Sequence, residues 1–137
     1  LQICQTLQKG QENFAYAPGK WSIQQVLGHI IDTERIFSYR TLSISRGEKQ
    51  ALLGFDENEY LVGAQYESQD FSEILNQYRH VRQATISLIE SFSTNQANHM
   101  GNVNGNSVSV RALSWMIAGH EKHHIQIIKE RYLSQNP

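Results

Sequence analysis

The chain has 137 residues and a formal net charge of −1, which suits one domain with its own hydrophobic core. This charge balance excludes a strongly basic nucleic-acid surface and a polybasic membrane surface, so we expect neither partner. No run approaches the roughly 18 apolar residues of a membrane span. The single cysteine, Cys4, cannot close an intrachain disulfide, and the cytoplasm is the expected compartment.

The hydrophobic pattern predicts four helices within a single domain over residues 1–137. The first is expected over residues 1–11, and because the sequence starts inside this pattern, we expect the N-terminal helix to be incomplete. The second opens at Ser22, with Gln25 at the spacing of a capping box, and stops at Gly47.

The third predicted helix opens near Asp70 and continues to Phe92, and the fourth runs from about residues 107–109 to Leu133. No strand-like alternation longer than a few residues is found, so we expect an all-α four-helix bundle. The connection over residues 48–69 is too long for a tight turn, and we expect it to cross the bundle. The segment over residues 98–106 is expected to be a loop whose Asn-Gly turns reflect backbone geometry.

Several ionisable residues fall on the apolar faces of these helices. Glu34 and Arg82 are interpreted as an internal ion pair that fixes helix register, because an unpaired buried charge is costly. In the fourth helix, His120, Glu121 and His124 share a face with Leu113 and Ile117. His80 lies opposite the apolar face of its helix, and His99 and His123 are expected at the surface or in loops.

The pair His120 and His124 is the most informative feature. Histidines four residues apart stack on one helical face, as two ligands of one metal ion require. Two buried imidazoles without a metal would have poorly matched donors and acceptors, which favours metal ligation. For His29 alone, the helical pattern favours an ordinary hydrogen-bonded core residue.

Residues 120–124 also satisfy H-E-x-x-H, the signature of zincin proteases. Zincins set this helix beneath a sheet whose edge strand binds the peptide, and no such strand is expected here. Only 13 residues follow His124, and none of them is a histidine. A protease is therefore the less favoured interpretation, although Glu121 remains a candidate proton acceptor.

Four further segments are informative when taken together: KWSIQQVLGHIIDTERIFSYR (20–40), GFDENEY (54–60), NGNSVSVRALSWMIAGHEKHH (104–124) and IKERY (128–132). Together they resemble the DinB-like superfamily, within the branch of the YfiT-type metal-dependent hydrolases and the bacillithiol and mycothiol S-transferases. The resemblance implies an up-down-down-up bundle that holds a divalent transition metal, usually nickel or zinc. It also implies His29, His120 and His124 as the three ligands, and a homodimer.

Three histidines leave coordination positions open, as in catalytic metal sites. The favoured hypothesis is a metal-dependent transferase or hydrolase that activates water or a low-molecular-weight thiol against a small-molecule electrophile. The thiol is implied by the resemblance alone. Asp32 and Glu121 are candidate catalytic residues, as imidazole-orienting acceptors or as a general base. The alternatives are a non-catalytic, stress-associated metal-binding protein and a dimeric interaction module with a structural metal.

Overall fold

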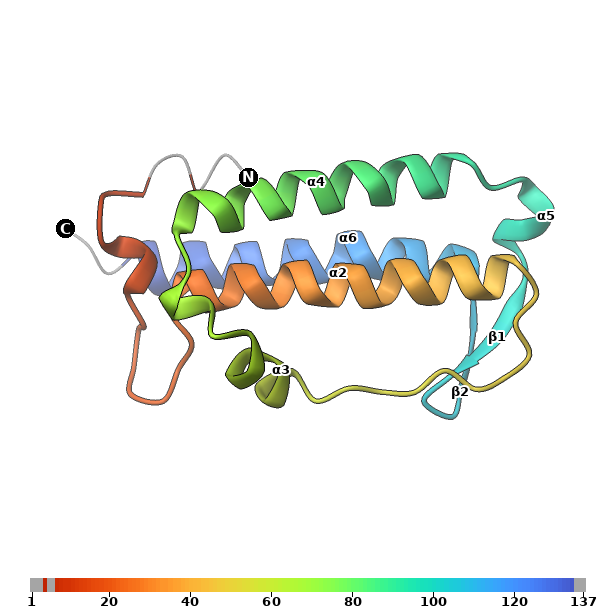
Figure 1. Cartoon of the computed structure of the whole chain (residues 1–137), viewed down its shortest axis with the longest axis horizontal. Helices are drawn as coiled ribbons and strands as arrows, with labels where there is room; N and C mark the ends of the chain where they lie inside the picture. Colours follow the sequence, from red (N-terminus) through yellow and green to blue (C-terminus); the bar gives the residue numbers. More distant parts are fainter. Residues whose placement is uncertain (1–3, 5–6, 135–137) are drawn as a thin grey trace.

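The computed structural model of this chain describes residue 4 and residues 7–134. Three long helices form its framework: α2 (Ile23–Ser45), α4 (Phe71–Glu90) and α6 (Val110–Ile127). Figure 1 shows α2 and α4 running in the same direction, with α6 returning beside α2. These directions match the last three helices of the expected up-down-down-up order.

The segment expected as the first helix is described only in part, because residues 1–3, 5 and 6 lie outside the described residues. Within its described part, residues 7–10 are irregular, and a short 3-10 helix, η1 (Gln11–Asn13), follows. The expectation of helix is wrong for residues 7–10. Gly10 there has φ 93°, a left-handed conformation that does not continue a helix.

The three long helices begin at the predicted capping residues. Ser22 and Gln25 form the capping box of α2, whose C-terminal turn is followed by Gly47 at φ 90°. Asp70 accepts from the backbone N–H of Ser72 at the start of α4, and Ser109 caps α6. α6 continues as a π-helix, η3 (Ile128–Leu133), which confirms the predicted end at residue 133.

The connection between α2 and α4 crosses the bundle as expected, but part of it is helical. It contains α3 (Glu57–Ala64), capped by Asp56, and a 3-10 turn, η2 (Tyr66–Ser68). The buried ring of Tyr66 lies directly against Gly28 of α2, where a Cβ atom would stand 2.2 Å from the ring. Gly28 is therefore what allows this segment to pack closely on α2.

The expected loop before the last helix is a short β-hairpin, which corrects the purely helical prediction. A short helix, α5 (Thr94–Ala97), leads into antiparallel strands β1 (Met100–Val103) and β2 (Asn106–Ser109). The turn residues Asn104 and Gly105 have φ 50° and 81°, as a type I′ turn requires. Leu52 pairs with Val103 beside β1, so the crossing segment is joined to the hairpin.

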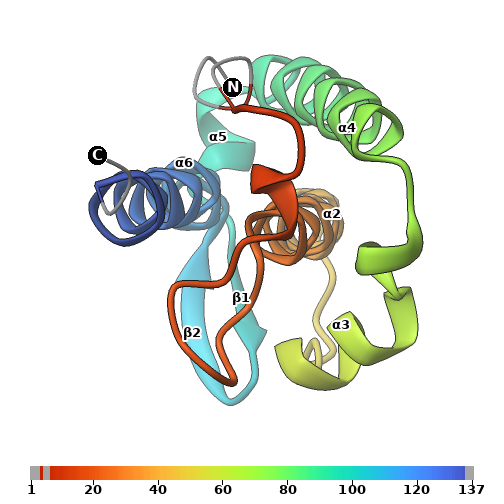
Figure 2. The same ribbon diagram turned by 90° about the vertical axis from the view of Figure 1, so that its left-hand side faces the viewer.

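α2 is the central helix of the described structure. In the end-on view, α4 lies on one side of it and the hairpin lies on the opposite side (Figure 2). The main core gathers apolar side chains of α2 with those of α3, η2, α4 and η3: Ile23, Val26, Leu27, Ile30, Ile31, Leu61, Tyr66, Ile74, Tyr78, Ile128 and Tyr132. Among the described residues, no helix is long and apolar enough to cross a membrane.

Candidate metal centre

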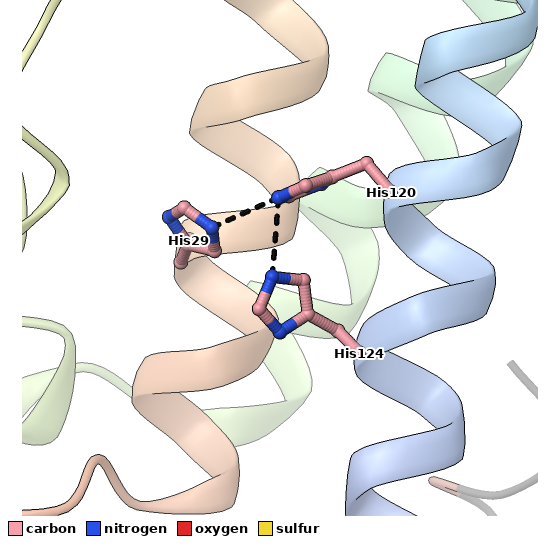
Figure 3. A group of neighbouring side chains, drawn as sticks. All are labelled: His29, His120 and His124. Atoms are coloured by element: carbon pink, nitrogen blue, oxygen red, sulfur yellow. Dashed lines mark hydrogen bonds between the residues drawn. The ribbon is translucent and has the colours of Figure 1, made fainter.

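Three histidines converge between α2 and α6. His29 comes from α2, and His120 and His124 come from successive turns of α6, with their rings pointing toward one another (Figure 3). The Nε2 atom of His120 lies 3.0 Å from Nε2 of His29 and 3.1 Å from Nε2 of His124. One ligand atom from each residue lies within 4.8 Å of the other two. The structure therefore brings together the three predicted ligands.

This convergence fits a metal better than a hydrogen-bond network. A ring nitrogen carries either one proton or one lone pair, so Nε2 of His120 cannot pair well with two neighbours. A cation between the rings would accept all three lone pairs. Tetrahedral zinc, with Zn–N bonds of about 2.0–2.1 Å, places its nitrogen ligands about 3.3 Å apart, close to the separations found here. The three histidines could therefore hold a divalent metal.

Burial keeps the histidines in the form that binds metal. His29 is buried, and His120 and His124 are partly buried. Loss of hydration first, and then the charge of a neighbouring histidine, lower the pKa of each of the three to about 4. All three imidazoles are therefore neutral at pH 7, and metal binding there does not have to displace protons.

Other side chains of the region fix the ring of His29. Thr33 lies one turn along α2, with its Oγ1 3.5 Å from Nδ1 of His29. An Nδ1–H that donates to this oxygen leaves Nε2 free to bind the metal. The indole of Trp21 covers the ring of His29, with centroids 5.0 Å apart. Phe37 lies farther along α2, with its ring 6.4 Å from that of His120.

The two carboxylates predicted to be catalytic lie in different surroundings. Asp32 pairs with Arg35 at 3.2 Å near the surface of α2. Glu121 accepts from the phenol of Tyr78 and forms an ion pair of 2.5 Å with Arg82, so α4 engages both of its oxygens. These contacts do not match the zincin arrangement, in which the glutamate serves the metal. The catalytic roles of Asp32 and Glu121 stay predictions.

The predicted ion pair between Glu34 and Arg82 is confirmed. Arg82 of α4 lies 2.8 Å from Glu34 of α2, and its guanidinium also contacts Glu121 of α6. Glu34 is only 2% exposed. These residues and Tyr78 form a polar cluster that joins the three long helices. Because His120 directly precedes Glu121, the cluster also fixes the turn of α6 that carries this ligand.

A cavity of about 300 Å³ lies beside His124, near the start of α2. His124 forms part of its wall, together with residues of the segment before α2, of α2, α3, α6 and η3: Tyr16, Gly19, Lys20, Trp21, Val26, Asn58, Ile127 and Tyr132. Sequence reasoning missed this pocket, because its walls come from segments far apart in the chain. His80 and His123 are exposed, as predicted, and His99 is partly buried in the loop between α5 and β1, which agrees with its expected place at the surface or in a loop.

The fold and site define a class of protein: a helical bundle in which two antiparallel helices present three histidines to one metal position. A family model of the DinB superfamily matches residues 1–128. The chain therefore belongs to the DinB superfamily, which confirms the resemblance inferred from its sequence.

Two solved structures from Bacillus subtilis share the fold. One is YfiT, which is described as a probable metal-dependent hydrolase with an unusual four-helix bundle topology. YfiT is 16% identical in sequence, and the match has a TM-score of 0.74 and covers 93% of this chain and 77% of YfiT. The other, the DinB-like protein YjoA, is also 16% identical, with a TM-score of 0.67 over 97% of this chain and 80% of YjoA. No curated protein is significantly similar in sequence.

Proposed function

We propose that this chain is a metal-dependent hydrolase of small electrophilic substrates, with His29, His120 and His124 as the metal ligands. The observation that carries the proposal is the convergence of three neutral imidazoles beside a cavity of about 300 Å³. A purely structural site would use four protein ligands, whereas three leave room for a reactant. The description of YfiT as a probable metal-dependent hydrolase supports the same reaction class.

A divalent metal bound at this position supplies Lewis acidity and lowers the pKa of water toward neutrality. The residues of the chain supply position and selectivity. Tyr16, Trp21 and Tyr132 give the cavity aromatic walls that suit an apolar substrate body, and Lys20 and Asn58 offer polar contacts. Trp21 also shields the ring of His29 from solvent on one side.

A transferase would use the same site with a low-molecular-weight thiol in place of water. That thiol follows from the family resemblance, and nothing in the lining of the cavity selects it over water. Nickel or zinc as the metal, the cytoplasm as the location and the homodimer likewise stay predictions. Asp32 and Glu121 are proposed as the residues that assist proton transfer, directly or by positioning the α2 and α6 ligands.

Elemental analysis of the protein, purified without an affinity tag or added metal, tests the proposal. We expect about one equivalent of a divalent transition metal, as one three-histidine site would hold. It should be lost in His29→Ala, His120→Ala and His124→Ala. His123→Ala is the matched control, because His123 is exposed on the same helix. Ester and amide hydrolysis assays with the loaded protein then test the reaction.

Two results would contradict the proposal. A native protein that contains no metal and takes up none on titration would leave the three histidines as structural residues. Equal loss of metal in the His123→Ala control would show that the metal is bound somewhere else. If metal is bound by the three histidines but no hydrolysis is detected, thiol-transfer assays with the same loaded protein follow.

A further inference from the structure

The guanidinium of Arg40 is buried without an acidic partner. Arg40 lies on α2 and is only 6% exposed. Among the described residues, no carboxylate lies within 4.0 Å of it, and its one protein hydrogen bond is donated by Nη2 to the backbone oxygen of Leu53, at 2.6 Å. The rings of Phe37 and Phe55 lie 5.4 and 5.8 Å from its Cζ atom. Burying an unpaired charge costs free energy, unless a ligand of opposite charge binds to it.

Arg40 lines two cavities, and one of them suits an anion. This cavity, of about 320 Å³, lies between α2, the hairpin and α6, and its polar lining includes Asn104, Asn106 and Ser107. None of the described residues that line it is acidic. The other cavity, of about 450 Å³, contains Glu48, whose carboxylate accepts from the backbone of residues 49 and 50. The first cavity is therefore the favourable one for a negatively charged group.

The same cavity neighbours the candidate metal centre through two residues of its wall, although none of the three histidines lines it. Arg40 follows His29 by eleven residues, which is about three turns of helix and about 16 Å along the axis, so both residues are on one face of α2. Phe37 lines the cavity and lies beside both His120 and the Arg40 guanidinium. Met116, one turn before His120 on α6, lines the cavity as well.

We propose that Arg40 binds the carboxylate group of a small molecule in the hairpin cavity. A guanidinium presents a planar fork of N–H donors that matches a carboxylate, and flanking aromatic rings hold that fork in place. The anion site rests only on the burial and surroundings of Arg40.

Binding of benzoate to the metal-free protein tests the anion site, because removing the metal excludes direct coordination of the carboxylate. The measurement is a titration followed by the Nε–Hε signal of Arg40 and the backbone amides of residues 104–107 in ¹H–¹⁵N spectra. We expect saturable shifts with benzoate and none with benzamide, its neutral analogue. Arg40→Met should weaken benzoate binding by roughly tenfold or more, since a charged hydrogen-bond pair is lost.

Two further variants complete the design. Arg40→Lys keeps the positive charge but loses the planar pair of N–H donors, so this variant should also bind benzoate more weakly. It replaces Arg40→Met in the experiment if Arg40→Met does not fold. Arg46→Met is the matched control, because Arg46 lies over the ring of Phe92 yet is exposed. Benzoate binding in that variant should equal that of the unmodified protein.

Three outcomes would overturn the inference: no saturable shift with benzoate, equal shifts with benzamide, or unchanged affinity in both Arg40 variants. Stronger binding of inorganic phosphate than of benzoate would overturn the carboxylate assignment. The proposed function fails separately, through absence of metal at the three histidines or absence of hydrolysis. If benzoate binds at Arg40 but the protein as purified holds no metal at the three histidines and takes up none, the anion site is kept and the hydrolase is rejected.

Discussion

At the scale of single residues, Thr33 is the side chain expected to orient the ring of His29. Its hydroxyl is the oxygen beside Nδ1 of His29, at 3.5 Å, and an acceptor there fixes the tautomer that presents Nε2 to a metal. We expect Thr33→Val to weaken metal affinity by about tenfold without changing the fold. Competition with a chromogenic chelator measures the affinity.

Thr41→Val is the control for this prediction. Thr41 is another buried threonine of α2, but its hydroxyl donates to the backbone oxygen of Phe37 and does not contact the histidines. Its replacement should leave metal affinity unchanged. Metal affinity in Thr33→Val equal to that of the unmodified protein would show that Thr33 does not orient His29.

The lowered pKa values of the three histidines predict how the stability of the metal-free protein depends on pH. Each folded pKa is about 4, below an ordinary unfolded value of about 6.5. Between these values the unfolded chain binds more protons than the folded one. The stabilising contribution of the neutral histidines is thus complete above pH 6.5 and is lost as pH falls toward 4.

Urea unfolding of the metal-free protein between pH 7 and pH 5 measures this effect. The free energy of unfolding should decrease across that range, before most carboxylates titrate. A variant with glutamine at positions 29, 120 and 124 should show a much smaller decrease, and it retains the chain's other histidines. An equal decrease in both proteins would assign the pH dependence to groups outside the site.

The residues of the site differ in how far the sequence predicts them. The spacing of His120 and His124 carries its own geometric meaning, because neighbouring turns of one helix stack their side chains. His29 is 91 residues before His120, and no local pattern connects them, so it came only from the family resemblance. Thr33 and Arg40 gave no signal at all, because their roles arise from contacts between distant segments.

At the scale of elements, we expect the polar cluster to hold the three long helices together. It consists of Glu34, Tyr78, Arg82 and Glu121. Arg82 contacts one carboxylate on α2 and another on α6. Arg82→Met would leave Glu34 buried without its partner. We expect a loss of about 3 kcal/mol in the free energy of unfolding, measured in urea, because breaking a buried pair leaves an uncompensated charge.

Arg35→Met is the matched control for the cluster. Arg35 pairs with Asp32 at the surface, where its side chain is 45% exposed. Such a pair contributes about 1 kcal/mol or less, so this variant should be close to the unmodified protein in stability. Similar losses in the two variants would show that the buried cluster does not hold α4 on the other helices.

Long amphipathic helices were predictable, whereas short elements were not. The starts of α2, α4 and α6 each have a side-chain cap that the sequence displays. α3 has only eight residues, although Asp56 followed by Glu59 is a usable N-terminal signal. The hairpin strands have four residues each, too few for alternation to show. Their Asn104-Gly105 turn was interpreted as part of a loop.

At the scale of the whole molecule, the three histidines are not members of the main apolar core, although Val26 and Tyr132 of that core line the same cavity as His124. The main core forms around α2 from apolar side chains of α3, η2, α4 and η3. The histidines lie between α2 and α6, and Figure 3 shows their rings converging there. Packing of these helices does not require a metal to fill the space between the rings. This separation argues against a purely structural metal.

Removal of the metal is therefore expected to lower thermal stability without unfolding the chain. At a metal concentration about a thousandfold above its Kd, binding stabilises the folded state by about 4 kcal/mol, which for a domain of this size is a Tm shift on the order of 15 °C. Dialysis against a chelator should reverse that shift in Tm. The helical circular dichroism signal at about room temperature should stay nearly unchanged. His120→Ala, already unable to bind, should show no change on dialysis. Loss of helicity on metal removal would instead favour the hypothesis of an interaction module whose metal is structural, because only then does the fold depend on the ion.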